Sequence, residues 1–358
     1  MNSPGRPKSE YRSAQHEGTP VTSVFVTHPS DKFDQYFGAK ALRALQAIAD
    51  VRLNTQARDL SMPELIAAAR GCDALIAYRQ TPGPTALFQA LPKLNAFIRC
   101  AVDIRTVNVE AASAHGVLVT QASPGYAAAV AEWIIAVMLD LARGISRYAA
   151  AYHRDKPLAP VMGRELRGST IGVIGFGQIG RYLSDLALAF GMRVLVTTPD
   201  PVVALERLQL VSLSSLLAES DFVVCLASAN AQTENMMDAP AFAAMKTGAF
   251  FVNAARGELV DDAALFDALE SGRLAACALD VGRAPDQMPS PALARHPLVL
   301  AAPHIGGLTL PAVEHQAMET VSQLASLLKG EIPPGAVNSP HAMRLRRWGH
   351  AIDTEGLA

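Results

Sequence analysis

The sequence predicts an α/β protein with two parallel-sheet domains, one of them discontinuous. Its 358 residues, half of them hydrophobic, exceed the roughly 250–300 residues at which a single core usually divides. Short apolar runs alternate with helical patterns in two separate series, an order typical of parallel sheets covered by helices. A long helical pattern follows each series, so we expect these helices where the chain passes between domains.

The first series describes a small parallel α/β layer. It follows a polar leader, residues 1–20, which we expect to be disordered. Apolar runs predict strands at 21–27, 51–54, 74–78, 96–101 and 117–120. Alanine-rich and amphipathic patterns predict helices at 39–49, 62–69 and 85–90.

The second series lies between the two long helical patterns. Residues 125–150 contain no proline and predict one long helix that crosses between domains. Beyond it we expect strands at 169–174, 193–197, 222–226, 250–253, 276–280 and 298–301, with helices at 178–190 and 263–271. A helix at 311–329 could then return the chain to the first domain. On this interpretation the first domain comprises 21–123 and 308–340, the second comprises 124–307, and 341–358 form a C-terminal tail.

Composition excludes several classes of partner. The net charge of -2 provides no field for holding nucleic acid or an anionic membrane. The first residues lack the apolar segment of a secretory signal, and no stretch stays apolar for the roughly 20 residues of a membrane span. The cysteines occur singly, without metal-ligand spacing, so we expect reduced core thiols and no metal site: Cys72, Cys100, Cys225 and Cys277. We therefore expect a cytoplasmic protein.

A glycine-rich turn at 175–180 predicts a dinucleotide site. The sequence Gly-Phe-Gly-Gln-Ile-Gly directly follows a predicted strand and opens a predicted helix. Gly175 would permit the tight turn, Gly177 would let a pyrophosphate approach the backbone, and Gly180 would let helix and strand pack closely. Gln178 and Ile179 begin the helix, whose N-terminal N–H groups attract the anion. Both domains are accordingly expected to be Rossmann-like.

The choice between NAD and NADP stays open from sequence. A carboxylate about 20 residues after the turn normally binds the ribose 2′-hydroxyl. Thr198 occupies that place, Asp200 follows two residues later, and no adjacent Arg or Lys could receive a 2′-phosphate. These residues favour NAD slightly.

Three later motifs, taken in order, resemble the D-isomer-specific 2-hydroxyacid dehydrogenases. They are Phe-Val-Asn-Ala-Ala-Arg-Gly-Glu-Leu-Val-Asp at 251–261, Ala-Leu-Asp-Val at 278–281 and Ala-Pro-His-Ile-Gly-Gly at 302–307. The resemblance also includes Val-Ala-Glu at 130–132 and covers nearly the whole chain. It implies an NAD(P)-binding domain inserted into a discontinuous substrate domain, with the active site between them. It further implies a homodimer, and hydride transfer between the cofactor and a small 2-hydroxy or 2-keto acid.

The motifs also suggest residue roles. Arg256 follows a predicted strand at the carboxyl edge of the sheet, where a guanidinium can bind a carboxylate and polarise the adjacent carbonyl. His304 follows a strand and a proline, and its imidazole suits proton transfer to or from the substrate oxygen. By resemblance, Asp280 and Ala254 would lie near the cofactor.

The sequence departs from the family pattern at the partner of this histidine. A family glutamate that orients the ring falls on Pro285 by strict count. We expect Asp286, one residue later, to take its place as the third catalytic residue. Gln287 is the alternative, and it would orient the ring without adding charge.

A second departure lies in the substrate domain. The family loop Gly-x-Gly-x-Asp-Asn reads Ala-Val-Asp-Ile-Arg-Thr at 101–106. Asp103 would repel an anionic substrate unless it points away or pairs with Arg105. Together with Arg79 and Val102 it is expected to bind substrate, although solvated loop charges would explain Asp103, Arg105 and Arg79 equally well. The alternative for the whole chain is a dinucleotide-binding regulator or scaffold on the same fold, with weakened or lost catalysis.

Overall fold

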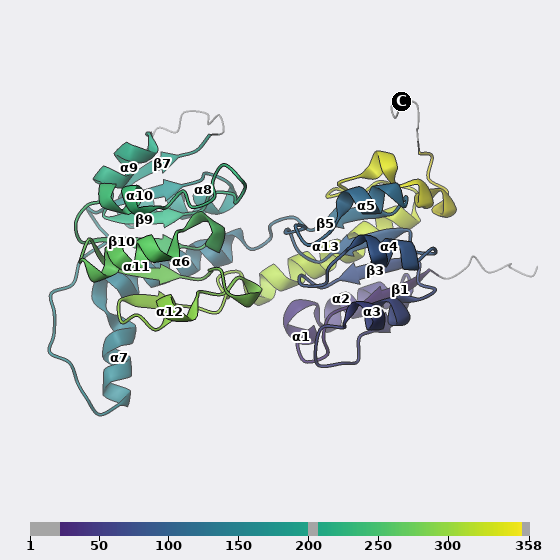
Figure 1. Cartoon of the computed structure of the whole chain (residues 1–358), viewed down its shortest axis with the longest axis horizontal. Coiled ribbons are helices and arrows are strands. Elements are labelled where there is room, and N and C mark those ends of the chain that lie inside the picture. Colours follow the sequence, from purple (N-terminus) through teal and green to yellow (C-terminus); the bar gives the residue numbers. More distant parts are fainter. Residues whose placement is uncertain (1–21, 200–206, 353–358) are drawn as a thin grey trace, which may run out of the picture.

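The computed structural model describes residues 22–199 and 207–352. The expected leader and Asp200 therefore lie outside the described residues. Figure 1 shows two α/β units side by side, and the chain passes between them twice. No helix in the described ranges is both long and apolar enough to span a bilayer.

The first unit contains a five-stranded parallel sheet in the order β2-β1-β3-β4-β5. Its strands are β1 (Ser23–Val26), β2 (Asp50–Leu53), β3 (Ala74–Ala77), β4 (Ala96–Arg99) and β5 (Leu118–Gln121). One face packs on α3 (Met62–Ala69), α4 (Thr85–Ala90) and α5 (Val109–Ala114). The other face packs on α1 (Phe33–Tyr36), α2 (Gly38–Gln46) and α13 (Leu310–Leu328). The chain thus returns to the first sheet, as expected of a discontinuous domain.

The last described residues also join this unit. The 3-10 turns η3 (Ser339–His341) and η4 (Met343–Trp348) follow α13. Ala342 and Leu345 are fully buried in the same apolar cluster as α13. Residues expected to form a tail therefore pack against the first sheet as far as they are described.

The second unit contains a seven-stranded parallel sheet in the order β12-β11-β10-β9-β6-β7-β8. Its strands are β6 (Thr170–Ile174), β7 (Arg193–Thr197), β8 (Gln209–Leu210), β9 (Phe222–Cys225), β10 (Ala249–Asn253), β11 (Leu274–Leu279) and β12 (Val299–Ala301). On one face lie α6 (Ala127–Arg143) and α8 (Gln178–Ala189). On the other lie α9 (Leu213–Glu219), α10 (Ala239–Ala244), α11 (Asp262–Glu270) and α12 (Pro291–Ala294).

The prediction of one unbroken helix over 125–150 is wrong. α6 ends at Arg143, and α7 (Ile145–His153) starts beyond Gly144, whose φ of 65° is left-handed. A left-handed glycine terminates a helix readily because it has no Cβ to clash. α7 then extends from the body of the second unit (Figure 1).

In each sheet the strand order reverses beside one strand, and this is the point at which such folds bind ligands. In the second sheet β6 lies between β7 and β9, and in the first sheet β1 lies between β2 and β3. The crevice outside the carboxyl ends of the strands at such a reversal is the usual ligand site. Loops after β3 and β4 contact loops after β10 and β11, so the carboxyl edges of the two sheets meet.

Candidate active site

The glycine turn has the shape that a dinucleotide requires. Gly175 has a φ of +100°, and a Cβ there would lie 2.6 Å from the carbonyl oxygen of Leu226. A Cβ on Gly180 would lie 2.4 Å from the carbonyl oxygen of Gly175, whereas a Cβ on Gly177 would meet no atom within 4 Å. Gly177 is the N-cap residue of α8 and has no side chain that could cap the helix. The turn therefore keeps open space and free N–H groups for a phosphate.

Arg256 lies just beyond β10, at the carboxyl edge of the second sheet. Asn253 closes β10 and shapes the loop, since its side chain accepts from the Ala255 N–H at 3.1 Å and donates to the Arg256 carbonyl at 2.9 Å. The Arg256 side chain is 27% exposed, and its Nε lies 3.8 Å from Oδ2 of Asp103 in the first unit. Arg256 thus faces the junction between the units.

Asp280 holds the loop that carries His304. Its buried carboxylate accepts from the N–H groups of Ile305 and Gly306, each at 2.8 Å. The His304 N–H also donates to the Asp280 carbonyl at 3.0 Å. Burial raises the pKa of Asp280, an effect that the two N–H donors partly oppose. The residue expected near the cofactor is therefore also the support of the histidine loop.

His304 is oriented through its Nδ1 atom. This atom lies 3.2 Å from the main-chain carbonyl oxygen of Asp286. Because a carbonyl can only accept, Nδ1 carries a hydrogen and Nε2 is left for a substrate. Burial lowers the pKa of His304, and the positive charges of Arg79 and Arg256 lower it further. Oδ2 of Asp103 lies 3.8 Å from Arg256 Nε and 3.3 Å from Gln287 Nε2. The carbonyl of the neighbouring Asp286 contacts His304, so the two expected catalytic side chains belong to one site.

Asp286 contacts His304 through its main-chain carbonyl and not through its carboxylate. The Asp286 carboxylate instead forms an ion pair with Arg79 of the first unit. Gln287 donates from Nε2 to Oδ2 of Asp103 at 3.3 Å. In this structure neither the Asp286 carboxylate nor the Gln287 amide contacts the imidazole in the way that the sequence suggested.

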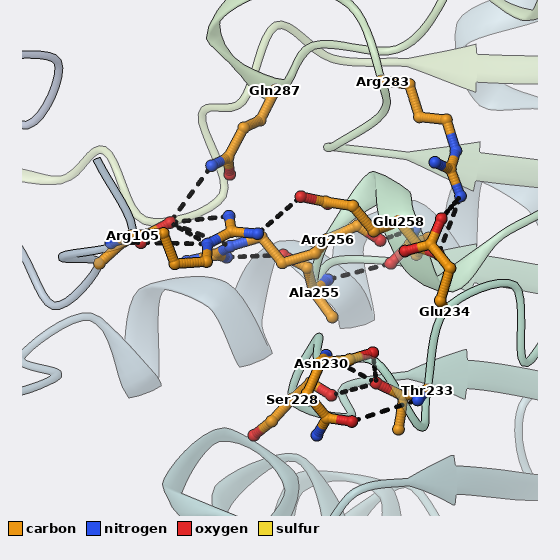
Figure 2. A network of polar contacts seen from close by, with 12 residues as sticks. Arg105, Ser228, Asn230, Thr233, Glu234, Ala255, Arg256, Glu258, Arg283 and Gln287 are labelled. Atoms are coloured by element: carbon orange, nitrogen blue, oxygen red, sulfur yellow. Dashed lines mark hydrogen bonds and ion pairs between the residues drawn. The ribbon is translucent and has the colours of Figure 1, made fainter. Parts of the chain in front are cut away.

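Asp103 lies among cationic groups in the loop after β4. Arg105 donates to it from Nε at 3.1 Å and from Nη2 at 2.8 Å. Although burial alone would raise the pKa of Asp103, the hydrogen bonds from Arg105 hold it well below its usual range. Figure 2 shows Arg105, Arg256 and Gln287 converging here, with Glu258 close by. Asp103 is thus an ionised neighbour of the expected carboxylate clamp.

Sequence reasoning missed the second partner of Arg105. Its Nη1 lies 2.6 Å from Oε1 of Glu258, in the second unit. Glu258 stands in the same motif as Arg256, and Arg283 steadies its loop by donating to the Glu258 carbonyl at 2.9 Å. The sequence shows Arg256 and Glu258 two residues apart in this motif. It gives no signal that Glu258 pairs with Arg105 of the first unit.

The remaining expected site residues fall at the same edges. Thr198 follows β7, Ala254 follows β10 and is 9% exposed, and Val102 precedes Asp103 in the loop after β4. Burial raises the pKa of Tyr126, which also experiences the charges of Arg256 and Asp103. A Cβ on Gly307 would lie 3.2 Å from the Tyr126 Cβ, which places Tyr126 beside the histidine loop.

Comparisons with known proteins identify the family. Residues 135–306 match the family model of the D-isomer specific 2-hydroxyacid dehydrogenase NAD binding domain. D-3-phosphoglycerate dehydrogenase of Mycobacterium tuberculosis is 34% identical over 281 residues, which are 77% of this chain and 53% of that protein. The solved structure of the TT0316 protein of Thermus thermophilus is 31% identical, covers 88% of this chain and 100% of that one, and has a TM-score of 0.79.

The chain belongs to the D-isomer specific 2-hydroxyacid dehydrogenase family. It spans about half the length of the curated relatives it matches. A putative member from Polaromonas, with 22% identity and a TM-score of 0.82, covers 89% of this chain and 100% of its own and shares the fold. Within this family framework, Pro285 at the glutamate position and Asp103 in the substrate loop remain the two departures.

Proposed function

We propose that this dehydrogenase-family protein is an NAD-dependent oxidoreductase acting on a small 2-hydroxy or 2-keto acid. One observation carries the proposal: Arg256, after β10, and His304, after β12, both lie beyond the carboxyl ends of strands in the sheet that bears the open glycine turn. A guanidinium for a carboxylate and an imidazole for a proton are the groups that this reaction needs.

The chain's own residues would act as follows. Arg256 binds the carboxylate of the acid and polarises its 2-oxo group. His304 gives a proton from Nε2 to the oxygen as the keto acid is reduced, or accepts it in the reverse direction, while Nδ1 stays on the Asp286 carbonyl. Asp280 keeps the histidine loop in place. A bound nicotinamide supplies or accepts the hydride.

We assign the cofactor to residues 124–307, with the substrate domain formed by 21–123 and 308–340. Contacts to the dinucleotide would come from the turn at 175–180 and from Thr198, Ala254 and Asp280. Thr198 follows β7, and because the sequence beside it offers no Arg or Lys for a 2′-phosphate, NAD is the cofactor that we propose.

The substrate side would be formed by Arg79, Val102 and Asp103, opposite Arg256. The Asp103 carboxylate already lies near Arg256, so an incoming acid must share this guanidinium or displace Asp103. This arrangement disfavours a purely anionic substrate and favours one with a polar group that Asp103 can accept from.

We further propose a cytoplasmic homodimer that pairs through the cofactor domain. The α7 arm and the segment after it carry large exposed apolar side chains: Ile145, Tyr152, Leu158, Val161 and Met162. A second copy packing on this arm would cover them. Sedimentation should give a dimer that Met162→Asp converts to a monomer.

A substrate screen tests the activity. Purified protein should oxidise NADH when given at least one member of a 2-keto acid panel, with His304→Ala and Arg256→Ala losing turnover. Tight NADH binding by fluorescence, with no substrate-dependent oxidation using either NADH or NADPH, would instead favour a dinucleotide-binding regulator.

A further inference from the structure

We propose that Arg79 is a positioning residue for His304 and acts on it through Asp286. This inference rests on the proposed role of His304 in proton transfer. The contacts run from Arg79 Nη2 to the Asp286 carboxylate, and from the Asp286 carbonyl to His304 Nδ1 at 3.2 Å. Arg79 belongs to the first unit, whereas Asp286 and His304 belong to the second.

The backbone at this point is held in an uncommon conformation. Asp286, Gln287 and His304 have φ values of 59°, 57° and 56°, and they are three of the five non-glycine residues with positive φ in the described ranges. A left-handed conformation is unfavourable for a non-glycine residue and persists only where its surroundings hold it. Main-chain hydrogen bonds close the ends of the loop, and the ion pair with Arg79 adds a side-chain contact at Asp286 itself.

Arg79 is itself well placed to hold a fixed geometry. Its guanidinium lies over the ring of Tyr36, 5.1 Å from the centroid. The Arg79 and Asp286 side chains are only 21% and 26% exposed, so solvent screens their pair less than one on the open surface. Arg79 is therefore a rigid anchor rather than a mobile surface arginine.

The orientation of His304 therefore depends on a residue of the first unit. The Asp286 carbonyl keeps the hydrogen of His304 on Nδ1, and so keeps Nε2 for the substrate. Without Arg79 the loop at 285–287 can relax, and the carbonyl no longer fixes the ring. The acid/base group is thus fully oriented only when the two units lie together. A carboxylate of the second unit that contacted His304 directly would orient the ring without any contact from the first unit.

The test combines NMR with kinetics on the full chain. Histidine-labelled protein, with the His304 signals assigned by His304→Gln, should show His304 with its hydrogen on Nδ1 at a pH where the ring is neutral. In Arg79→Gln and in Asp286→Ala we expect a mixture of both tautomers. The keto acid kcat should fall about 10- to 100-fold in either variant, with the KM for NADH unchanged.

A double variant separates positioning from direct substrate binding. If Arg79 acts through Asp286, then Arg79→Gln combined with Asp286→Ala should be no slower than the slower single variant. Multiplied losses, or a raised keto acid KM with unchanged kcat in Arg79→Gln alone, would overturn the proposal. So would a His304 tautomer that Arg79→Gln leaves unaltered.

A matched control removes another ion pair between the units. Glu258→Gln removes the carboxylate charge that Arg105 Nη1 meets at 2.6 Å, and because Glu258 contacts neither Asp286 nor His304, the hydrogen should stay on Nδ1. A tautomer change there equal to that in Arg79→Gln would mean that any loosening of the units suffices, and would overturn the specific role of Arg79. If wild type reduces no keto acid, the proposed function fails, yet the NMR comparison still decides this inference.

Discussion

Replacing Asp280 by asparagine should damage both stability and catalysis. The buried Asp280 carboxylate accepts two N–H groups at 2.8 Å, from Ile305 and Gly306, and an asparagine can accept only one of them. Losing a hydrogen bond to a charged group costs about 1.5–3 kcal/mol. Burial already raises the pKa of Asp280, so removal of the charge offsets part of this loss. We expect a net destabilisation of about 2 kcal/mol.

This loss should be measurable by thermal and urea unfolding. For a unit of this size, about 2 kcal/mol corresponds to a Tm lower by roughly 4–8 °C. The keto acid kcat should fall as well, because the loop carrying His304 loses one of its two side-chain anchors. The hydrogen bond from the His304 N–H to the Asp280 carbonyl survives the substitution.

Asp261→Asn provides the matched control. The Asp261 side chain caps α11 through a single oxygen, Oδ1, which accepts from Ala263 at 2.9 Å and Ala264 at 3.2 Å. Asparagine caps helices as well as aspartate does, so the change should stay within about 0.5 kcal/mol. Equal Tm values for the two variants would refute the anchoring role of Asp280.

Three further predictions concern the cofactor, the proton and the substrate. Gly177→Ala should weaken NADH binding at least tenfold, measured by fluorescence, with little change in Tm, whereas Gly175→Ala should lower Tm because its Cβ would overlap a main-chain carbonyl. Because the pKa of His304 is lowered, kcat/KM for keto acid reduction should fall as pH rises through a value below the usual histidine range, and oxidation should rise there; a midpoint above that range would contradict the assignment. Asp103→Asn should lower the keto acid KM roughly fivefold, because it removes about 1 kcal/mol of repulsion between the Asp103 carboxylate and the substrate carboxylate beside Arg256. An unchanged or higher KM would argue against this repulsion.

Most of the architecture could be predicted because its signals are local. Strands such as β3 and β9 are buried on both faces and therefore read as short apolar runs. The end of α6 escaped prediction because alanine-rich residues on both sides of Gly144 continue the helical composition. The short helices α9 and α10 also escaped, although Ser212 and Asp238 cap them and each precedes an apolar stretch.

The site likewise has parts with a local sequence signal and parts without one. The turn at 175–180 is one continuous segment in which Gly175 and Gly180 avoid steric overlap and Gly177 leaves open space, so sequence alone could predict it. The pairing of Arg79 with Asp286 joins residues 207 positions apart, and it depends on a left-handed backbone at an aspartate. Such a conformation has no sequence signal comparable to a glycine, so the carboxylate was expected on His304 instead.

We propose that this protein transfers a hydride to the 2-oxo carbon of a keto acid while His304 supplies the proton. NADH carrying deuterium at both C4 positions should be incubated with wild type and the best keto acid of the panel, and the product examined by mass spectrometry. We predict one deuterium on C2 of the 2-hydroxy acid, and none in a parallel reaction with His304→Gln within a single wild-type turnover time. A hydroxy acid formed without deuterium, or no hydroxy acid at all, would contradict the account.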